Sequence, residues 1–351
     1  MKPKIPVRRS VARMRPYNPP LEGRGDKVRL DFNENPLGCS SAVRRALREL
    51  SAAAVSMYPE QESARAKLAS FFRVRREELL LTNGTDEALK LLVDAFVDPG
   101  SSVLIVEPTF AMYRFYSELA GARVRALQYD DELRFPMKDV LAALRKAPRL
   151  FFLANPDSPT GNLLSPRELL KILKAAQRTM VVVDEAYFEF CEMTVLPWIR
   201  RHSNLIVTRT FSKAAGLAGL RLGCIFAERE IAAQIRKAQS PYPVNVAALA
   251  AGLAAMRDRG FIARTLRETR LGRKALEQGL NRLGIPFFPS DGNFVLVDFG
   301  SRAKEIVSAL AHGGVLLRNR SSDFGGKGYV RITLGTLAQT RHLLRRLEEI
   351  L

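Results

Sequence analysis

The 351-residue sequence has few of the residues that build disulfide frameworks and metal sites. Its three cysteines, Cys39, Cys191 and Cys224, are far apart, odd in number and without CxxC spacing. A disulfide framework is therefore not expected, and a reducing compartment fits. The three histidines have no metal-ligand spacing to one another or to the cysteines. We accordingly expect no metal site and no histidine-based catalytic triad.

Long apolar runs are also missing. The longest, residues 245–256, is rich in alanine and far short of the ~20 residues that a membrane span needs. Hydrophobic residues still make up 47% of the chain, which is enough for a packed core. We expect a globular cytoplasmic protein with no membrane partner, and the length suggests about two domains.

Acidic residues are in deficit, with 36 Asp and Glu against 55 Lys and Arg, which gives a net charge of +19. Such an excess can attract nucleic acid, anionic membranes or anionic small molecules. The cations are interspersed with acids along expected helix faces, as in residues 165–177. The densest basic stretch, residues 2–15, is interrupted by prolines, which is typical of an extended arm. Nucleic acid is therefore not expected as a partner, and most of the surplus is assigned to solubility.

Short apolar segments alternate with amphipathic ones from about residue 79 to 238. Strands are expected at 103–107, 149–154, 180–184, 204–208 and 222–227, and helices at 85–97, 109–119, 136–146 and 165–177. This alternation predicts βαβ units and an α/β fold with a mostly parallel central sheet flanked by helices. Near-continuous apolar strands such as 180–183 indicate burial on both faces.

The pattern changes after the Pro-rich turn at 240–243. Two long helices (243–258 and 260–282), strands near 293–299, 314–318 and 328–333, and a closing helix from 336 are expected there. This order predicts a second, smaller α/β domain. We therefore divide the chain into an N-terminal arm at 1–30, a large domain at 31–240 and a small C-terminal domain at 241–351.

Two reactive groups follow neighbouring expected strands. Asp184 ends one strand, and Lys213 follows the next, ahead of a run of small residues at 214–220. Ligands of open α/β sheets bind beyond the carboxyl ends of the strands. A strand-end aspartate alone usually caps a helix, and a loop lysine alone is usually solvated. Together they predict a desolvated lysine amine that acts as a nucleophile and forms a Schiff base.

A possible phosphate turn precedes the helix expected at 85–97. Gly84 would let backbone N–H groups at the helix N-terminus approach an anion. The plain alternative is an ordinary cap at Thr85. Asp86 and Glu87 in the first turn would repel a phosphate unless they are engaged elsewhere.

Three segments, in this order and spacing, resemble the fold-type-I pyridoxal-phosphate-dependent aminotransferases, and among them the histidinol-phosphate aminotransferases. The segments are Asn155-Pro-Asp-Ser-Pro-Thr-Gly161, Asp184-Glu-Ala-Tyr187 and Ser212-Lys-Ala-Ala-Gly-Leu-Ala-Gly-Leu-Arg-Leu-Gly223. The resemblance runs from about residue 17 to the closing helix. It implies pyridoxal 5'-phosphate as the cofactor.

The resemblance also implies catalytic roles for three residues. Lys213 would hold the cofactor as a Schiff base and then carry a proton, Asp184 would pair with the pyridine nitrogen, and Tyr187 would hydrogen-bond the ring O3′. The residues implied at the cofactor phosphate are Gly84, Thr85, Asp86, Ser212 and Arg221. Tyr113 would stack on the pyridine face. Tyr58 would reach the cofactor phosphate of a neighbouring subunit, which implies a homodimer.

One position departs from the family pattern. Ser158 stands where the family commonly has an asparagine that bonds the cofactor O3′. A serine hydroxyl is shorter, so we expect that contact to be weaker, bridged by water or taken over by Asn155. The expected effect is a shifted Schiff-base pKa more than a loss of activity.

The resemblance implies anionic small-molecule substrates. Arg331 matches an arginine that grips an α-carboxylate, a task that suits the guanidinium fork. Arg318, thirteen residues earlier, and Tyr17, on the arm, match contacts to a substrate phosphate, and Asn33, in the first loop of the site, is expected as a further substrate contact.

The implied reaction interconverts L-histidinol phosphate and 2-oxoglutarate with imidazole acetol phosphate and L-glutamate, a step of histidine biosynthesis. An aromatic amino acid aminotransferase and a threonine-phosphate decarboxylase with the same cofactor site are alternatives. A basic nucleic-acid-binding protein on a catalytically inactive fold is an alternative of a different class.

Overall fold

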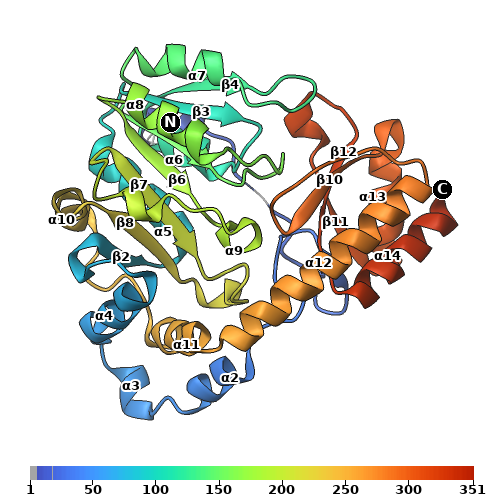
Figure 1. Ribbon diagram of the computed structural model, residues 1–351, viewed down its shortest axis with the longest axis horizontal. Helices are drawn as coiled ribbons and strands as arrows, with labels where there is room; N and C mark the ends of the chain where they lie inside the picture. Colours follow the sequence, from blue (N-terminus) through green and yellow to red (C-terminus); the bar gives the residue numbers. More distant parts are fainter. Residues whose placement is uncertain (1–5, 18) are drawn as a thin grey trace, which may run out of the picture.

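The computed structural model describes residues 6–17 and 19–351, which form two α/β bodies linked by the long helix α12 (Arg259–Arg282) (Figure 1). The larger sheet has the strand order β2-β8-β7-β6-β5-β3-β4. Its strands are β2 (Leu79–Thr82), β3 (Ser102–Glu107), β4 (Arg123–Gln128), β5 (Leu150–Ala154), β6 (Met180–Asp184), β7 (Leu205–Thr210) and β8 (Gly223–Ala227). Neighbouring strands are parallel except at β8, which runs antiparallel to β2 and β7. The expected α/β class with a mostly parallel sheet is confirmed.

Side chains of the central strands pack into a core on each face of this sheet. Along β5, Phe151 and Leu153 join one cluster, and Leu150 and Phe152 join the other. The first cluster is covered by α4 (Gln61–Phe72), α7 (Met137–Leu144), α8 (Pro166–Ala175) and α11 (Val246–Arg257), and the second by α5 (Gly84–Phe96), α6 (Met112–Leu119) and α10 (Arg229–Ala238). Burial on both faces explains why these strands read as near-continuous apolar runs.

The smaller sheet has helices on one face only. Its order is β1 (Val28–Leu30), β11 (Val315–Asn319), β12 (Tyr329–Thr333), β10 (Phe294–Asp298) and β9 (Phe287–Phe288), and it is covered by α12, α13 (Ala303–His312) and α14 (Leu337–Ile350). Val330 and Ile332 of β12 pack into that helical side. Because side chains alternate along a strand, Arg331 and Thr333 lie on the opposite face, toward the larger body. The remaining helices are α1 (Arg9–Arg13), α2 (Ser41–Arg48), α3 (Ala52–Ser56) and α9 (Phe188–Cys191), with 3₁₀ turns at Arg76–Glu78, Leu196–Trp198, Ala218–Leu220, Gly300–Arg302 and Ser321–Phe324.

Two elements lie across the expected domain boundaries. Strand β1 pairs with β11 of the smaller sheet, although residues 28–30 were assigned to the arm. Helix α11 follows the expected boundary at residue 240, yet Ala248 and Ala251 pack into the core of the larger sheet. The helix is rich in alanine, so it can lie close to α2 and α4.

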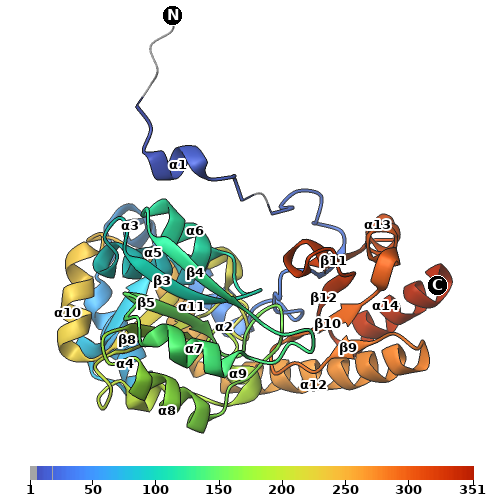
Figure 2. The ribbon, with the colours of Figure 1, turned by 90° about the horizontal axis from the view of Figure 1, so that it is seen from above.

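Helix α1, in the N-terminal arm, lies on the outside of the larger body, next to α6 (Figure 2). Helix α1 buries no side chain, whereas Tyr17 further along lines the cavity described below. The first five residues of the expected arm, and Asn18, lie outside the described residues. Within the described part of the chain, no helix is both long and apolar enough to cross a membrane.

Candidate functional site

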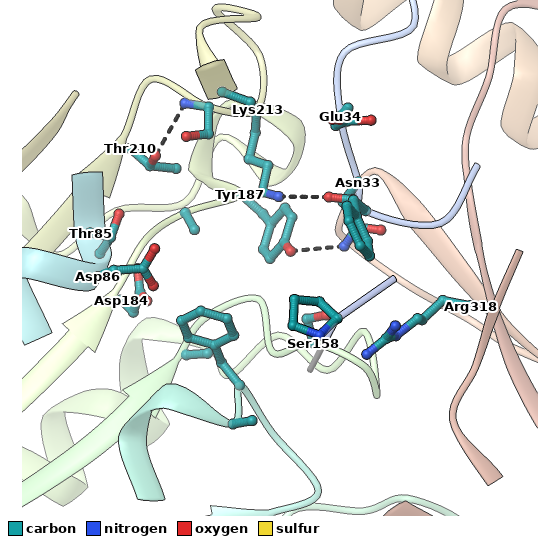
Figure 3. A pocket seen from close by; sticks show the side chains of 18 of the residues that line it. Asn33, Glu34, Thr85, Asp86, Ser158, Asp184, Tyr187, Thr210, Lys213 and Arg318 are labelled. Atoms are coloured by element: carbon teal, nitrogen blue, oxygen red, sulfur yellow. Dashed lines mark hydrogen bonds between the residues drawn. The ribbon is translucent and has the colours of Figure 1, made fainter. Parts of the chain in front are cut away.

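A cavity of about 310 Å³ lies between the two sheets, beyond the carboxyl ends of β3, β5, β6 and β7 (Figure 3). This edge is where an open α/β sheet presents its loops to a ligand. The predicted site residues that line the cavity are Tyr17, Asn33, Thr85, Asp86, Tyr113, Ser158, Asp184, Tyr187, Ser212, Lys213, Arg221, Arg318 and Arg331. Gly84 and Tyr58 do not line it.

Lys213 extends from the turn after β7 into the cavity. Its Nζ donates a hydrogen bond to the main-chain oxygen of Phe32 at 3.0 Å, and it lies 5.8 Å from the centre of the Tyr187 ring. The turn fits closely because Gly216 has a φ of +69°, and a Cβ there would overlap the main-chain oxygen of Gly38. The lysine amine is therefore presented by a rigid turn, half-buried and beside a neutral acceptor.

Asp184 ends β6 with only 5% of its surface exposed. Its Oδ2 accepts a hydrogen bond from the Tyr113 hydroxyl at 2.9 Å, while its Oδ1 is buried with no partner among the described residues. Burial raises the pKa of this carboxyl to about 6, and the bond from Tyr113 acts in the opposite direction. A cationic N–H donor would satisfy the free oxygen, and the protonated pyridine nitrogen of pyridoxal phosphate is such a donor.

The start of α5 forms one end of the cavity. Thr85 Oγ1 is buried there and has no partner among the described residues. The guanidinium of Arg221 donates to Asp86 Oδ2 at 2.7 Å, and Glu87 accepts from the main-chain N–H of Asn83, so both acids of the first turn are engaged elsewhere. With Asp86 paired to Arg221 and Glu87 bonded to the main chain, the helix N-terminus can hold an anion such as a phosphate.

Gly84 lies next to Arg221 at this end of the cavity. It has a φ of +76°, and a Cβ there would overlap the guanidinium of Arg221. A glycine is therefore required for the arginine to lie against the turn. Ser212, from the lysine turn, lines the same cavity and is also buried.

Tyr113 is part of the hydrophobic core as well as of the cavity wall. Its ring stacks on Phe152 with 5.1 Å between the ring centres, and its hydroxyl bonds to Asp184. Burial, with the nearby Asp184, raises the pKa of the Tyr113 phenol well above its ordinary value, so the phenol is a hydrogen-bond donor at neutral pH. Stacking of this ring on a pyridine face stays a prediction.

Ser158 bonds to an arginine. Its Oγ accepts from Arg331 Nη1 at 3.0 Å, and the other terminal nitrogen of Arg331 donates to the main-chain oxygen of Asp31 at 2.6 Å. Burial lowers the pKa of Arg331 to about 10, which leaves it charged at neutral pH. Asn155 does not line the cavity and its amide bonds to the main chain of Leu164, so the structure gives no support to the idea that it takes over the missing contact.

The opposite end of the cavity is lined by cations from the smaller sheet. Arg318 on β11 lies opposite Arg331 on the neighbouring strand β12. Arg320 follows Arg318 by two residues, and all three arginines line the cavity. The Arg320 guanidinium lies 2.5 Å from Asp323, which holds it in place. Arg318 stands across the cavity from Thr85 and Asp86 (Figure 3). The cavity thus has a helix N-terminus suited to an anion at one end and a group of arginines at the other.

Several lining residues were missed from the sequence. Phe32 and Glu34 flank Asn33, and the Phe32 ring lies 4.0 Å from the Arg24 guanidinium and 5.7 Å from that of Arg318. Arg320 could have been found, because it directly follows β11 and the alternation of that strand, continued by one residue, places it on the same face as Arg318. Phe32 had no comparable signal.

Tyr58 lies apart from the cavity of its own chain. It is 75% exposed and stacks on Tyr242, with 4.2 Å between the ring centres. Its predicted contact with the cofactor phosphate of a neighbouring subunit can form only in a dimer, and it stays a prediction.

Residues 25–347 match the family model for aminotransferase class I and II, so the chain belongs to this family. The solved aminotransferases that match the structure confirm the expected fold-type-I class. The histidinol-phosphate aminotransferase of Symbiobacterium thermophilum is 38% identical over 98% of both chains. The recognition made from the sequence motifs is confirmed by these matches.

Two solved structures bear on the site. That of histidinol-phosphate aminotransferase from Sinorhizobium meliloti in complex with pyridoxal-5'-phosphate is 26% identical, with a TM-score of 0.85, and the match covers 92% of this chain and 90% of that one. That of L-threonine-O-3-phosphate decarboxylase from Porphyromonas gingivalis is 27% identical, with a TM-score of 0.80 over 92% and 98%.

Proposed function

We propose that this chain is a pyridoxal-phosphate-dependent histidinol-phosphate transaminase that exchanges an amino group between L-glutamate and imidazole acetol phosphate in histidine biosynthesis. The observation that carries the proposal is that one cavity has two separate ends that are each suited to an anion. Thr85 and Arg221 form an end suited to the cofactor phosphate, and Arg318 and Arg331 form another suited to an anionic substrate. The 38% identity to a histidinol-phosphate aminotransferase over 98% of both chains supports the same assignment.

The residues around the reacting atoms have distinct tasks. Pyridoxal phosphate supplies a carbonyl that can bond to an amine and a ring that withdraws electrons from the substrate carbon. Asp184 would accept a hydrogen bond from the protonated ring nitrogen through its Oδ1, which is buried with no partner among the described residues. Lys213 would hold the cofactor through its Nζ and, once displaced by the substrate amine, would carry the proton between the substrate carbon and the cofactor.

The end of the cavity lined by Arg318, Arg320 and Arg331 would bind each of the two substrates in turn. Arg318 and Arg320 would hold the phosphate of histidinol phosphate, with Tyr17 closing over it from the arm. Arg331 would hold the α-carboxylate of glutamate, because its guanidinium lines the cavity and its Nε is buried with no partner among the described residues. One cationic end therefore serves two substrates that enter at different stages.

The alternatives are less well supported. The solved threonine-phosphate decarboxylase is 27% identical and the solved Sinorhizobium meliloti transaminase 26%, so these structures do not separate the two activities, whereas the sequence relative at 38% identity is a transaminase. Aromatic side chains also line the cavity, but Arg318, Arg320 and Arg331 at the same end favour an anionic substrate over an uncharged aromatic side chain. A nucleic-acid-binding protein on an inactive fold would not need the unpaired carboxylate oxygen of Asp184.

We also infer a homodimer. Val55, Met57, Tyr58 and Tyr242 are exposed apolar side chains, each more than half exposed. Clusters of this kind commonly mark association surfaces. In the dimer, Tyr58 would contact the cofactor phosphate of the neighbouring subunit. A cytoplasmic location also stays a prediction.

Absorption spectroscopy and steady-state kinetics together test the proposal. The protein mixed with pyridoxal phosphate should gain a visible band and should transaminate histidinol phosphate with a higher kcat/KM than phenylalanine. The Lys213→Ala variant should lose the band, while Lys274→Ala, on the exposed face of α12, should keep it. Preference for phenylalanine, or release of CO2 from L-threonine O-3-phosphate, would select one of the alternatives. No visible band with the unaltered chain would overturn the enzyme assignment.

A further inference from the structure

The segment between β1 and α2 contacts the two principal cations of the site through its main chain. The main-chain oxygen of Asp31 accepts from Arg331 at 2.6 Å, and that of Phe32 accepts from Lys213 at 3.0 Å. Arg331 belongs to the smaller sheet and Lys213 to the larger one. A single short segment therefore joins groups from both bodies, and its next residue is Asn33.

Asn33 is almost completely buried, with 1% of its surface exposed, and its polar atoms are all bonded. Its main-chain N–H donates to Thr333 Oγ1 at 2.9 Å, and the same hydroxyl donates to Asn33 Oδ1 at 3.1 Å. Its main-chain oxygen accepts from Asn293 at 3.1 Å. The amide oxygen is thus occupied, which leaves Nδ2 to donate to the Tyr187 hydroxyl oxygen at 2.8 Å (Figure 3).

The backbone of Asn33 adds a second requirement. Its φ of +55° lies in the left-handed region, which asparagine tolerates better than most residues and glycine adopts freely. A glycine would keep this conformation and lose the amide. An alanine would lose the amide and also strain the backbone. Asn33→Gly therefore tests the loss of the amide alone, without backbone strain.

Thr333 anchors the amide from the smaller sheet. It lies two residues after Arg331 on β12, so both side chains are on the face toward the cavity. The position of the Tyr187 hydroxyl, on the larger body, is therefore fixed through Asn33 by the strand that carries the substrate-binding arginine.

We propose that Asn33 is a positioning residue that acts through Tyr187. Its amide donates to the phenol oxygen, which leaves the phenol proton free for the ring oxygen of the cofactor and makes that proton a stronger hydrogen-bond donor. Asn33 was expected among the substrate contacts, and the hydrogen bonds assign it this other task. The inference rests on the proposed function, because it requires a cofactor held by Lys213.

The test is the pH titration of the visible band of the bound cofactor. Without the amide, Tyr187 donates less strongly to the cofactor ring oxygen, so that oxygen is more negative and the Lys213 nitrogen beside it keeps its proton to higher pH. Asn33→Gly should therefore raise the titration midpoint by up to roughly 0.7 pH unit, the equivalent of one net hydrogen bond. It should lower kcat/KM roughly fivefold. Arg73→Gly, at an exposed position with a φ of +58°, is the matched control and should leave the midpoint unchanged.

A double-mutant cycle with Tyr187→Phe shows whether the effect passes through Tyr187. In the Tyr187→Phe protein, Asn33→Gly should add no further shift. Thr333→Val, which removes the anchor of the amide, should shift the midpoint in the same direction by less, and it provides the test should Asn33→Gly not fold. An unshifted midpoint in Asn33→Gly and Thr333→Val, or a full shift in the Tyr187→Phe background, overturns the inference. A wild-type protein without a visible band would instead overturn the proposed function.

Discussion

The buried carboxyl of Asp184 should destabilise the cofactor-free protein at neutral pH. Burial raises its pKa from an ordinary 3.8 to about 6. Each pKa unit corresponds to about 1.36 kcal/mol, so this rise of roughly two units corresponds to about 3 kcal/mol of folding free energy. The folded chain binds this proton more tightly than the unfolded chain does. The resulting stabilisation is present below the ordinary pKa and is lost as the pH rises through about 6.

Asp184→Asn removes this titration and keeps the shape of the side chain. We expect the free energy of unfolding of the variant, relative to the wild type, to rise by up to about 3 kcal/mol as the pH rises from roughly 4 to 7. Urea unfolding of both cofactor-free proteins measures the difference. The unpaired amide adds an offset of about 1–3 kcal/mol that does not depend on pH, so the slope is the test. Asp157, whose pKa burial also raises to about 6, is present in both proteins and cancels.

A stability difference that stays constant over this pH range would refute the reasoning. Saturating pyridoxal phosphate provides a second check, because a cationic ring nitrogen would satisfy the free oxygen of Asp184. The cofactor should therefore raise the Tm of the wild type more than that of Asp184→Asn.

Three further results are expected. Ser158→Asn should move the titration midpoint of the bound cofactor downward, because a longer side chain can reach the cofactor ring oxygen, and an unchanged midpoint would contradict this. Arg320→Ala should raise the KM for histidinol phosphate roughly tenfold, the size of a lost charged hydrogen bond, and leave the KM for phenylalanine unchanged, with Arg270→Ala on the exposed face of α12 as the control. Tyr58→Ala should weaken cofactor binding measured by fluorescence titration, and mixing it with Lys213→Ala should restore some activity through hybrid dimers. Full cofactor affinity in Tyr58→Ala would exclude a contact across the dimer.

Buried parallel strands could be predicted closely from the sequence. The strand expected at 180–184 is observed as β6 with the same bounds, because an apolar run ended by a polar residue marks both burial and the strand end. The direction of β8 could not be predicted, since apolar periodicity is the same for parallel and antiparallel strands. Strand β4 was missed because its side chains are mostly half-exposed and give no strong pattern.

The site was predictable where a residue acts through its own chemistry. Lys213 and Asp184 stand out because an amine and a carboxylate follow neighbouring strands. The engagement of Asp86 by Arg221 spans 135 residues, and the bond between Asn33 and Thr333 spans 300. No local pattern carries such contacts, so they depend on the tertiary fold.

The arm makes the two halves of the site unequal in local stability. The cofactor end is built from buried strand ends and the start of α5, which should open only with global unfolding. Tyr17 lies on the arm and is 45% exposed, and helix α1 of the same arm buries no side chain. Segments with few buried contacts exchange their amide hydrogens through local opening at little free energy. Mild denaturant should therefore release substrate while the cofactor stays bound, so substrate affinity would depend on an ordering equilibrium of the arm.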